Sequence, residues 1–460
     1  MRKEKDSLGE LEIPDGVYYG IQSFRASQNF PISGTQVHPE LLKTYLLLKR
    51  CAAKANMQAG ALDSQRGDAI VNAVDALLEI DFRRHFIVDA YQAGAGTSQN
   101  MNANEVIANS ANEALGKPLG SYDPVNPNDH VNMSQSTNDT YPTVMRLATL
   151  SLSRGLVTEL EALRGALTSK ASEFDHVLKA ARTHLQDAVP IRLGQEFASY
   201  AETVGQLIHL LKDAQEYLQE LGIGGSAAGT GVNVPKGYRA AILEELKAVM
   251  NDPELRLAQN MGAAMQSQLP MTVYSNALKA VALELTRISN DLRLLSSGPS
   301  TGLAEIFLPA TQPGSSIMPG KVNPSILEMA NQVFFRVLGN DTTIAYSAQA
   351  GQLELNVMMP VMAHAALEAT ELLTATLRTL RTRCIDGITA NEARCLHYAE
   401  RTSQIATALN RVLGYAKAGE IAKESVESGK SIVELVREKG LLTEEQIPKL
   451  LDPRALTEPA

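Results

Sequence analysis

The feature that most constrains the fold is a long stretch of helical periodicity between about residues 140 and 390. In residues 201–221, apolar side chains recur mostly at helical spacing, and Gly222 stands where a helix C-cap is expected. Similar apolar stripes run through residues 144–167, 271–295 and 361–380. Because such helices must bury their apolar faces against one another, the sequence predicts a central bundle of long helices.

The composition supports a mainly helical interior. Hydrophobic residues make up 44% of the chain, aromatic residues only 5%, and tryptophan is absent, so Leu, Ala, Val, Ile and Met must form the core. Ala, Leu and Met lose little rotamer freedom in a helix. The apolar stripes are also wide, so we expect other subunits to complete the bundle.

A chain of 460 residues is too long for one simple core. Residues 1–138 mix short helices with turn-rich loops, residues 139–392 carry the long helical pattern, and residues 393–460 carry shorter, more charged helices. We therefore expect an N-terminal mixed helical domain, a central bundle and a small C-terminal helical domain, with these boundaries.

Charge and cysteine usage narrow the class of protein. A net charge of −9 argues against nucleic-acid binding, which needs a basic surface. Cys51, Cys384 and Cys395 form no paired motif, which fits a reducing compartment. We see no signal peptide, and no run approaches the roughly 18 apolar residues of a membrane span. The sequence predicts a soluble, cytoplasmic protein without membrane or nucleic-acid partners.

Four segments crowd hydroxyls, amides and glycines between helices: residues 94–105, 134–139, 182–187 and 314–324. Such donors at helix starts suit an anion. Helix capping is the simpler explanation for the first segment, but it does not account for six consecutive polar residues in the second. His184 in the third segment, which we expect to precede a helix, is a candidate for proton chemistry. The fourth is a small-residue loop that could close over a ligand.

Three other types of site are poorly supported. Five residues rather than four separate Gly314 from Gly320, and Val322 replaces the Ser or Thr that a phosphate loop requires. The glycines of residues 222–231 follow a helical pattern rather than a strand, so we assign them to an interhelical loop instead of a dinucleotide turn. The eight histidines are dispersed without a paired metal-binding motif, so no metal site is expected.

The fourth segment, GSSIMPGKVNP, resembles the GSSxxPxKxN loop of the aspartase/fumarase superfamily. The other polar segments occur in the order typical of that family, and the similarity runs from about Leu11 to Pro453. The motifs GAGTSQNMNANEVIAN and QSTND are similar to those of its aspartate ammonia-lyase branch more than to those of class II fumarases.

The resemblance implies a mainly helical, three-domain protomer and a homotetramer around a shared central bundle. It also implies active sites that are each assembled from three subunits, without a metal or an organic cofactor. It implies that Ser315 is the general base and that Glu354 orients His184. The residues implied to hold the substrate are Thr183, His184, Lys321 and Asn323 at the α-carboxylate, Thr97, Ser136, Thr137 and Ser316 at the β-carboxylate, and Asn138 near the amino group.

The reaction expected from this resemblance is reversible elimination of ammonia from L-aspartate to give fumarate. Removal of a Cβ proton creates an aci-carboxylate, which fixed hydroxyl and amide donors stabilise. Three interpretations remain open: aspartate ammonia-lyase, a related lyase (a fumarase or an ammonia-lyase for another amino acid), and a catalytically silent tetrameric scaffold. The presence of Ser315, Lys321, His184 and Glu354 favours an active enzyme.

Overall fold

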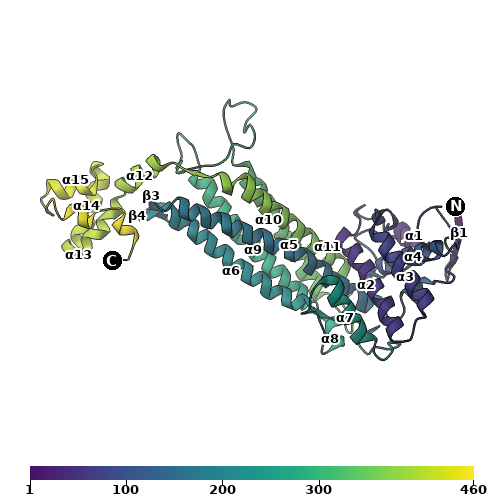
Figure 1. Ribbon diagram of the computed structural model, residues 1–460. Helices are drawn as coiled ribbons and strands as arrows, with labels where there is room; N and C mark the ends of the chain where they lie inside the picture. Colours follow the sequence, from purple (N-terminus) through teal and green to yellow (C-terminus); the bar gives the residue numbers. More distant parts are fainter. Residues whose placement is uncertain (460) are drawn as a thin grey trace. The chain divides into compact units, whose positions relative to one another are not determined.

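The computed structural model describes residues 1–459, and its fold is mainly α (Figure 1). The prediction of long central helices is confirmed. They are α5 (Thr137–Glu173), α6 (Leu193–Leu218), α9 (Leu269–Leu295), α10 (Ser325–Gln349) and α11 (Met359–Arg383). Within the described residues, no helix combines the length and apolar character needed to cross a membrane.

Residues 1–459 divide into two compact units. The first comprises Met1–Val157, His209–Ala282 and Phe335–Thr374. The second comprises Thr158–Ile208, Leu283–Phe334 and the chain from Ala375 onward. Each long helix contributes residues to both units, so the units do not follow the linear order of the chain. The three sequence domains stay a prediction.

The first unit contains the N-terminal elements and the polar segments at 94–105 and 134–139. Its shorter elements are β1 (Arg2–Asp6), β2 (Gly9–Ile13), α1 (Ile21–Asn29), α2 (Pro39–Gln58), α3 (Ser64–Leu78), η1 (Phe82–His85), η2 (Gly94–Gly96), α4 (Thr97–Ala114), η3 (Pro127–Val131), β5 (Glu220–Leu221), α7 (Tyr238–Met250), β6 (Arg256–Leu257) and α8 (Met261–Gln266). The antiparallel hairpin β1–β2 was not expected from a region interpreted as helices and loops.

Within the first unit, buried and partly buried polar contacts join the long helices. The Tyr274 hydroxyl on α9 lies 2.9 Å from the Thr370 hydroxyl on α11. The Ser275 hydroxyl, also on α9, donates to Asp341 on α10 at 2.7 Å. These contacts fix the rotation of each helix, which apolar packing alone specifies less sharply.

The second unit contains the remaining polar segments. Its shorter elements are β3 (Leu178–Thr183), β4 (Gln186–Arg192), β7 (Ile306–Phe307), η4 (Ile385–Gly387), β8 (Thr389–Ala390), α12 (Glu392–Arg401), η5 (Ser403–Leu409), α13 (Asn410–Leu413), α14 (Tyr415–Ser428), α15 (Ile432–Glu438), α16 (Ile447–Leu450) and η6 (Ala455–Thr457). The hairpin β3–β4 interrupts the region expected to be helical.

The helix expected at 201–221 differs from the observed one at both ends. Helix α6 begins earlier, at Leu193, and ends at Leu218, and the short strand β5 follows it. Gly222 is therefore not its C-cap, because the chain has already turned into an extended conformation. The apolar spacing predicted the body of the helix but not where it stops.

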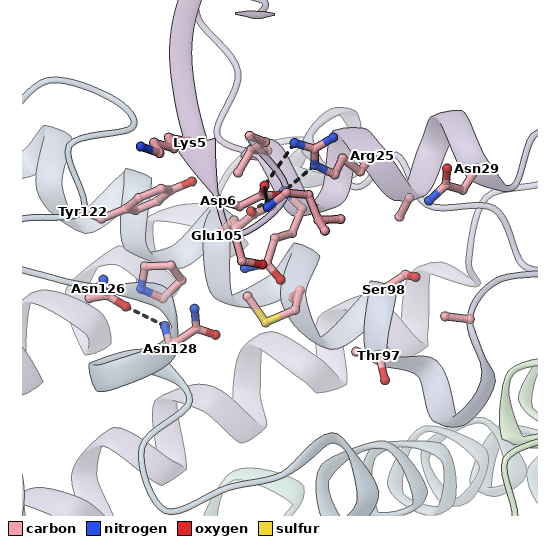
Figure 2. Close-up of a pocket in the computed structure, with 18 of the residues that line it drawn as sticks. Lys5, Asp6, Arg25, Asn29, Thr97, Ser98, Glu105, Tyr122, Asn126 and Asn128 are labelled. Carbon is pink, nitrogen blue, oxygen red and sulfur yellow. Dashed lines mark hydrogen bonds and ion pairs between the residues drawn. The ribbon is translucent and has the colours of Figure 1, made fainter. Parts of the chain in front are cut away.

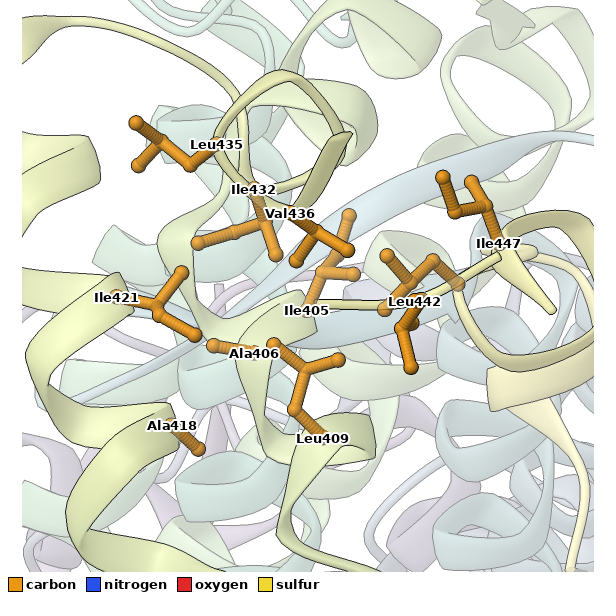
Figure 3. Close-up of a cluster of buried hydrophobic side chains, with 11 residues drawn as sticks. Ile405, Ala406, Leu409, Ala418, Ile421, Ile432, Leu435, Val436, Leu442 and Ile447 are labelled. Atoms are coloured by element: carbon orange, nitrogen blue, oxygen red, sulfur yellow. The ribbon is translucent and has the colours of Figure 1, made fainter. Parts of the chain in front are cut away.

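The C-terminal helices have a hydrophobic core of their own (Figure 3). Ile405 and Leu409 from η5 pack with Ile421 from α14 and with Leu435 and Val436 from α15. Each of these side chains is almost fully buried. This cluster explains why short, charged helices fold here, since each one presents its few apolar residues to the same interior.

Candidate functional site

The segment at residues 94–105 begins with a tight turn, η2, and continues as the first part of helix α4. Gly96 has φ +79°, and a Cβ at this position would overlap the buried ring of Tyr141, so only glycine fits. The turn leaves Thr97 exposed at the first position of α4. The backbone N–H of Ala95 donates to the carbonyl of Val357 at 2.8 Å, which places the exposed Glu354 in a segment next to this turn.

Thr97 and Ser98 line a pocket of about 600 Å³ in the first unit (Figure 2). Glu105 also lines this pocket, and its buried carboxylate accepts hydrogen bonds from the backbone N–H groups of Gly20, Gln22 and Ser23. Burial raises the pKa of Glu105 to about 7. Its contacts cap helix α1, so Glu105 has a structural role here.

The second polar segment begins helix α5, and hydrogen bonds join it to Asn100 and to Ala227. The amide nitrogen of Asn100 donates to the Thr137 hydroxyl at 3.1 Å. The Asn138 amide nitrogen donates to the carbonyl of Ala227 at 2.8 Å, and its backbone N–H donates to the Ser136 hydroxyl at 3.2 Å. Ser136, Thr137 and Asn138 are all partly exposed, so they can still reach a ligand.

Asp139 fixes the backbone of this segment through its buried carboxylate. It is fully buried, and its carboxylate accepts from the backbone N–H groups of Ser136, Gly224 and Ser226 at 2.9–3.0 Å. Burial raises the pKa of Asp139 to about 6. The glycine-rich loop at 222–231 is thus tied to the start of α5. It directly follows the two-residue strand β5 and precedes α7, so the expectation that it joins two helices was wrong at its first end.

Lys49 supports the second polar segment, and the sequence analysis did not identify it as a site residue. It lies on α2 with no exposed surface, and its ammonium group donates to Asn100 at 2.8 Å, Asn132 at 2.9 Å and Gln135 at 3.0 Å. Burial lowers the pKa of Lys49 to about 7. The available signal was a lysine directly after the apolar run Leu46–Leu48, at a position where a helix faces the core.

The third polar segment is the turn of a β-hairpin rather than the approach to a helix. Thr183 and Gln186 are paired, and His184 and Leu185 form the two-residue turn with φ +57° and +61°. Positive φ at both turn residues matches the right-handed twist of a hairpin but strains non-glycine residues by roughly 1–2 kcal/mol each. The hairpin holds Thr183 and His184 exposed at its tip.

The fourth polar segment is a closed loop around Ser315. The backbone N–H groups of Ile317 and Met318 donate to the Ser315 hydroxyl oxygen at 3.2 and 2.9 Å. The Gly314 N–H donates to the Lys321 carbonyl at 2.8 Å, and the Asn323 side chain donates to the Gly314 carbonyl at 2.5 Å. Ser316 and Lys321 are exposed on this loop. The loop therefore directs two amide dipoles at one serine oxygen.

The predicted site residues fall into two sets. Thr97, Ser136, Thr137, Asn138 and Glu354 belong to the first unit. The second unit contains Thr183, His184, Ser315, Ser316, Lys321 and Asn323. In residues 1–459, no hydrogen bond joins the Ser315 loop to the His184 turn, and no three His, Cys, Asp or Glu side chains are grouped to hold a metal ion.

Comparisons with known proteins agree with the motifs. A lyase family model matches residues 9–339, and a model of the fumarase C C-terminus matches residues 405–458. An aspartate ammonia-lyase from a Bacillus species is 47% identical over 459 residues, spanning all of this chain and 98% of that protein. The aspartate ammonia-lyase of Helicobacter pylori strain 26695 is also 47% identical, over 461 residues, with the same coverage.

Solved structures extend the agreement to the fold. A fumarate lyase:delta crystallin from Brucella melitensis bound to cobalt superposes with a TM-score of 0.96, at 45% identity, over all of both chains. A class II fumarase from Schistosoma mansoni also gives 0.96, at 33% identity, over 99% of both chains. With its motifs in family order and its whole length matched, this chain belongs to the aspartase/fumarase superfamily of lyases.

Proposed function

We propose that this chain is a carbon–nitrogen lyase that eliminates ammonia from L-aspartate to give fumarate. The full-length similarity to aspartate ammonia-lyases and the QSTND and GAGTS motifs support aspartate as the substrate. In this reaction a base removes one Cβ proton, and the Cα–N bond then breaks. The bonding electrons leave with ammonia, and a double bond forms between Cα and Cβ.

Ser315 is the proposed base, and its surroundings carry the proposal. A serine hydroxyl is a very weak acid, so its deprotonated form needs stabilisation before it can accept a proton. The N–H groups of Ile317 and Met318 already donate to this oxygen. Hydrogen bonds to the charged form of a group favour that form, and Lys321 on the same loop supplies a cation.

The β-carboxylate takes up the charge that develops when the proton leaves. We assign its recognition to the hydroxyls of Thr97, Ser136, Thr137 and Ser316, which are uncharged donors. Preorganised donors of this kind are typically worth about 3 kcal/mol each in a transition state. Asn100 holds Thr137, and Asp139 holds the backbone at Ser136, so at least two of these donors are rigidly supported.

The remaining assignments concern the other end of the substrate. Thr183, His184, Lys321 and Asn323 would hold the α-carboxylate, and Asn138 would lie near the departing amino group. Glu354 would orient His184. The exposure of Lys321 and of the hairpin tip supports ligand contact.

We further propose a homotetramer in which subunits share active sites. The superfamily forms tetramers. Large apolar side chains are exposed on three long helices: Leu210 and Tyr217 on α6, Leu269 and Leu283 on α9, and Phe335 and Tyr346 on α10. Each is between 44% and 66% exposed, and apolar side chains on the outer faces of long helices fit surfaces that another subunit covers. Light scattering on the purified protein tests the tetramer.

One assay tests the reaction. Purified protein is mixed with L-aspartate, and separately with L-malate, while fumarate absorbance and ammonia are followed. Ammonia and fumarate from aspartate alone are expected. Fumarate from malate would identify a fumarase instead, and inactivity toward both would indicate another amino-acid substrate or a silent scaffold.

A further inference from the structure

Glu305 is a buried carboxylate that takes no part in the proposed reaction. Its side chain has no exposed surface and lies between two cations of strand β3. The Arg182 guanidinium donates to Glu305 Oε1 at 2.9 Å, and the Lys179 ammonium lies 3.1 Å from Oε2. Lys179 also donates to Glu196 on α6 at 2.7 Å. Two positive and two negative charges therefore balance in this cluster.

A strand irregularity directs both cations at the same carboxylate. Residues 179 and 182 are three apart, so a regular strand would point them to opposite faces. The pairing of β3 with β4 shifts register between Ala180 and Arg182, as in a β-bulge. Such a shift changes the alternation, and both side chains then reach Glu305.

Glu305 itself is fixed by its backbone. Its N–H donates to the Leu295 carbonyl at 2.9 Å, and its carbonyl accepts from the Asn391 N–H at 2.9 Å. The strand β7, which starts at the next residue, pairs with β8. Glu305 is thus a rigid point against which the hairpin is held, whereas the hairpin tip beyond Arg182 is exposed.

We propose that Glu305 is a positioning residue for the substrate's α-carboxylate, acting through Arg182 on the adjoining Thr183 and His184. This inference rests on the proposed function, because it assigns these two residues to that carboxylate. Arg182 is also held over the ring of Tyr398 at 5.2 Å, so the carboxylate and the ring together orient the guanidinium. Glu305 sets substrate affinity without touching the substrate.

The test compares Glu305→Gln with a matched variant, Glu159→Gln. Glu159 is a nearly buried carboxylate of the same unit, and it pairs with Arg378 at 2.7 Å and Arg381 at 4.0 Å, outside the hairpin. Both variants lose one carboxylate between two cations. Glu305→Gln is expected to raise KM for L-aspartate about 10-fold with little change in kcat, as when binding common to ground and transition states is lost. Glu159→Gln is expected to leave KM unchanged.

Rescue and a second variant distinguish positioning from general stability. Glu305→Asp keeps the charge and should recover part of the affinity. Arg182→Gln leaves the Lys179–Glu305 pair in place, should also raise KM, and decides the matter if Glu305→Gln fails to fold. Wild-type KM in both Glu305→Gln and Arg182→Gln would overturn the proposal.

Hydrogen exchange separates this proposal from the proposed function. If wild-type protein releases no ammonia from aspartate, the proposed function fails. The hairpin peptide covering residues 178–192 should still exchange faster in Glu305→Gln than in Glu159→Gln. Equal exchange in the two variants would show that Glu305 does not hold the hairpin.

Discussion

The ammonium nitrogen of Lys49 lies 2.8 Å from the amide oxygen of Asn100. Because this contact occupies the oxygen, the amide nitrogen of Asn100 must point the other way, and there it donates to the hydroxyl of Thr137. In its ammonium form Lys49 also donates to Asn132 and Gln135. A fully buried lysine with only amide acceptors therefore sets the direction of a proposed substrate-binding hydroxyl.

Lys49→Met should lower kcat/KM for L-aspartate by roughly 10- to 100-fold, the loss typical of a misplaced binding group. Methionine fills a similar volume but cannot hold Asn100, so Thr137 would lose its fixed partner. Lys54→Met is the control, because Lys54 lies on the same helix but pairs with Glu245 at 3.1 Å. Steady-state kinetics with equal losses in the two variants would contradict a specific role for Lys49.

Lys49 should also give the folded protein a distinctive pH dependence. Burial lowers its pKa from 10.5 to about 7. Between these values the unfolded chain holds a proton that the folded chain lacks. The free energy of unfolding therefore rises with pH between about 7 and 10.5, and this stabilisation is lost again as the pH falls to about 7. The free energy of unfolding of wild type minus that of Lys49→Met should increase from pH 7 to 10, by at most about 1.4 kcal/mol per pH unit.

The measurement is urea unfolding of both proteins at several pH values and one protein concentration, since assembly also affects stability. A difference that stays flat or declines as pH rises would mean that Lys49 does not titrate with a lowered pKa. Lys54→Met again serves as the control, and its difference from wild type should not follow this trend.

Ser315→Ala should reduce kcat by at least about 10²-fold, because it removes the proposed proton acceptor. Thermal stability should hardly change, since the loop is largely exposed. Ser315→Thr keeps a hydroxyl that can accept from Ile317 and Met318, and it should retain more activity than the alanine variant. Turnover near wild type in Ser315→Ala would remove Ser315 from the role of base.

Local patterns predicted the parts of the molecule that depend on neighbouring residues. The apolar stripe at 271–295 matches α9 almost to its ends, because helix periodicity depends only on residues three and four positions apart. The small residues around Ser315 and Lys321 predicted a loop, and the structure has a loop at residues 314–324. The roles of these residues stay predictions.

The rest depended on contacts between distant segments. The hairpin at 178–192 interrupts a region predicted to be helical. Its turn places His184 and Leu185 at positive φ, although neither is a residue type that usually marks such a turn. From the sequence, Lys49 has the pattern of an ordinary helix lysine. Its buried role depends on Asn100, Asn132 and Gln135, which accept its hydrogen bonds in the folded chain. Such partners lie 51 to 86 residues away in the chain, beyond the reach of periodicity.

Gly314→Ala should abolish most activity while leaving the fold intact. A Cβ at Gly314 would lie 2.6 Å from the backbone nitrogen of Asn323 and from the carbonyl oxygen of Lys321, so the loop could not close in its present form. Gly320→Ala is the matched comparison. Its Cβ meets no atom within 4 Å, although φ +78° imposes a strain of roughly 1 kcal/mol.

Kinetics and thermal melting of the two glycine variants check this prediction. Gly314→Ala should lose much more turnover than Gly320→Ala, with similar melting temperatures. Equal activity in the two variants would show that the closed arrangement around Ser315 is not needed for turnover.

Sharing of active sites between subunits can be tested by mixing inactive variants. If one subunit supplies Ser315 and another supplies His184 to each site, Ser315→Ala and His184→Ala chains should complement each other. Random reassembly of an equal mixture leaves about one quarter of the sites with both residues intact, because each of the two contributing chains has an even chance of being the right one. Activity is measured after the mixed protein is dissociated and refolded.

The control for this experiment pairs Ser315→Ala with Lys321→Ala. These residues lie on one loop, which a single chain supplies to a site. Every loop in this mixture therefore lacks either Ser315 or Lys321. This mixture should stay as inactive as its parents. Recovery in the first mixture but not in the second supports sites that combine the loop of one subunit with the hairpin of another. If both mixtures stay inactive, the two segments must come from the same chain, because only then does every site inherit one of the two defects.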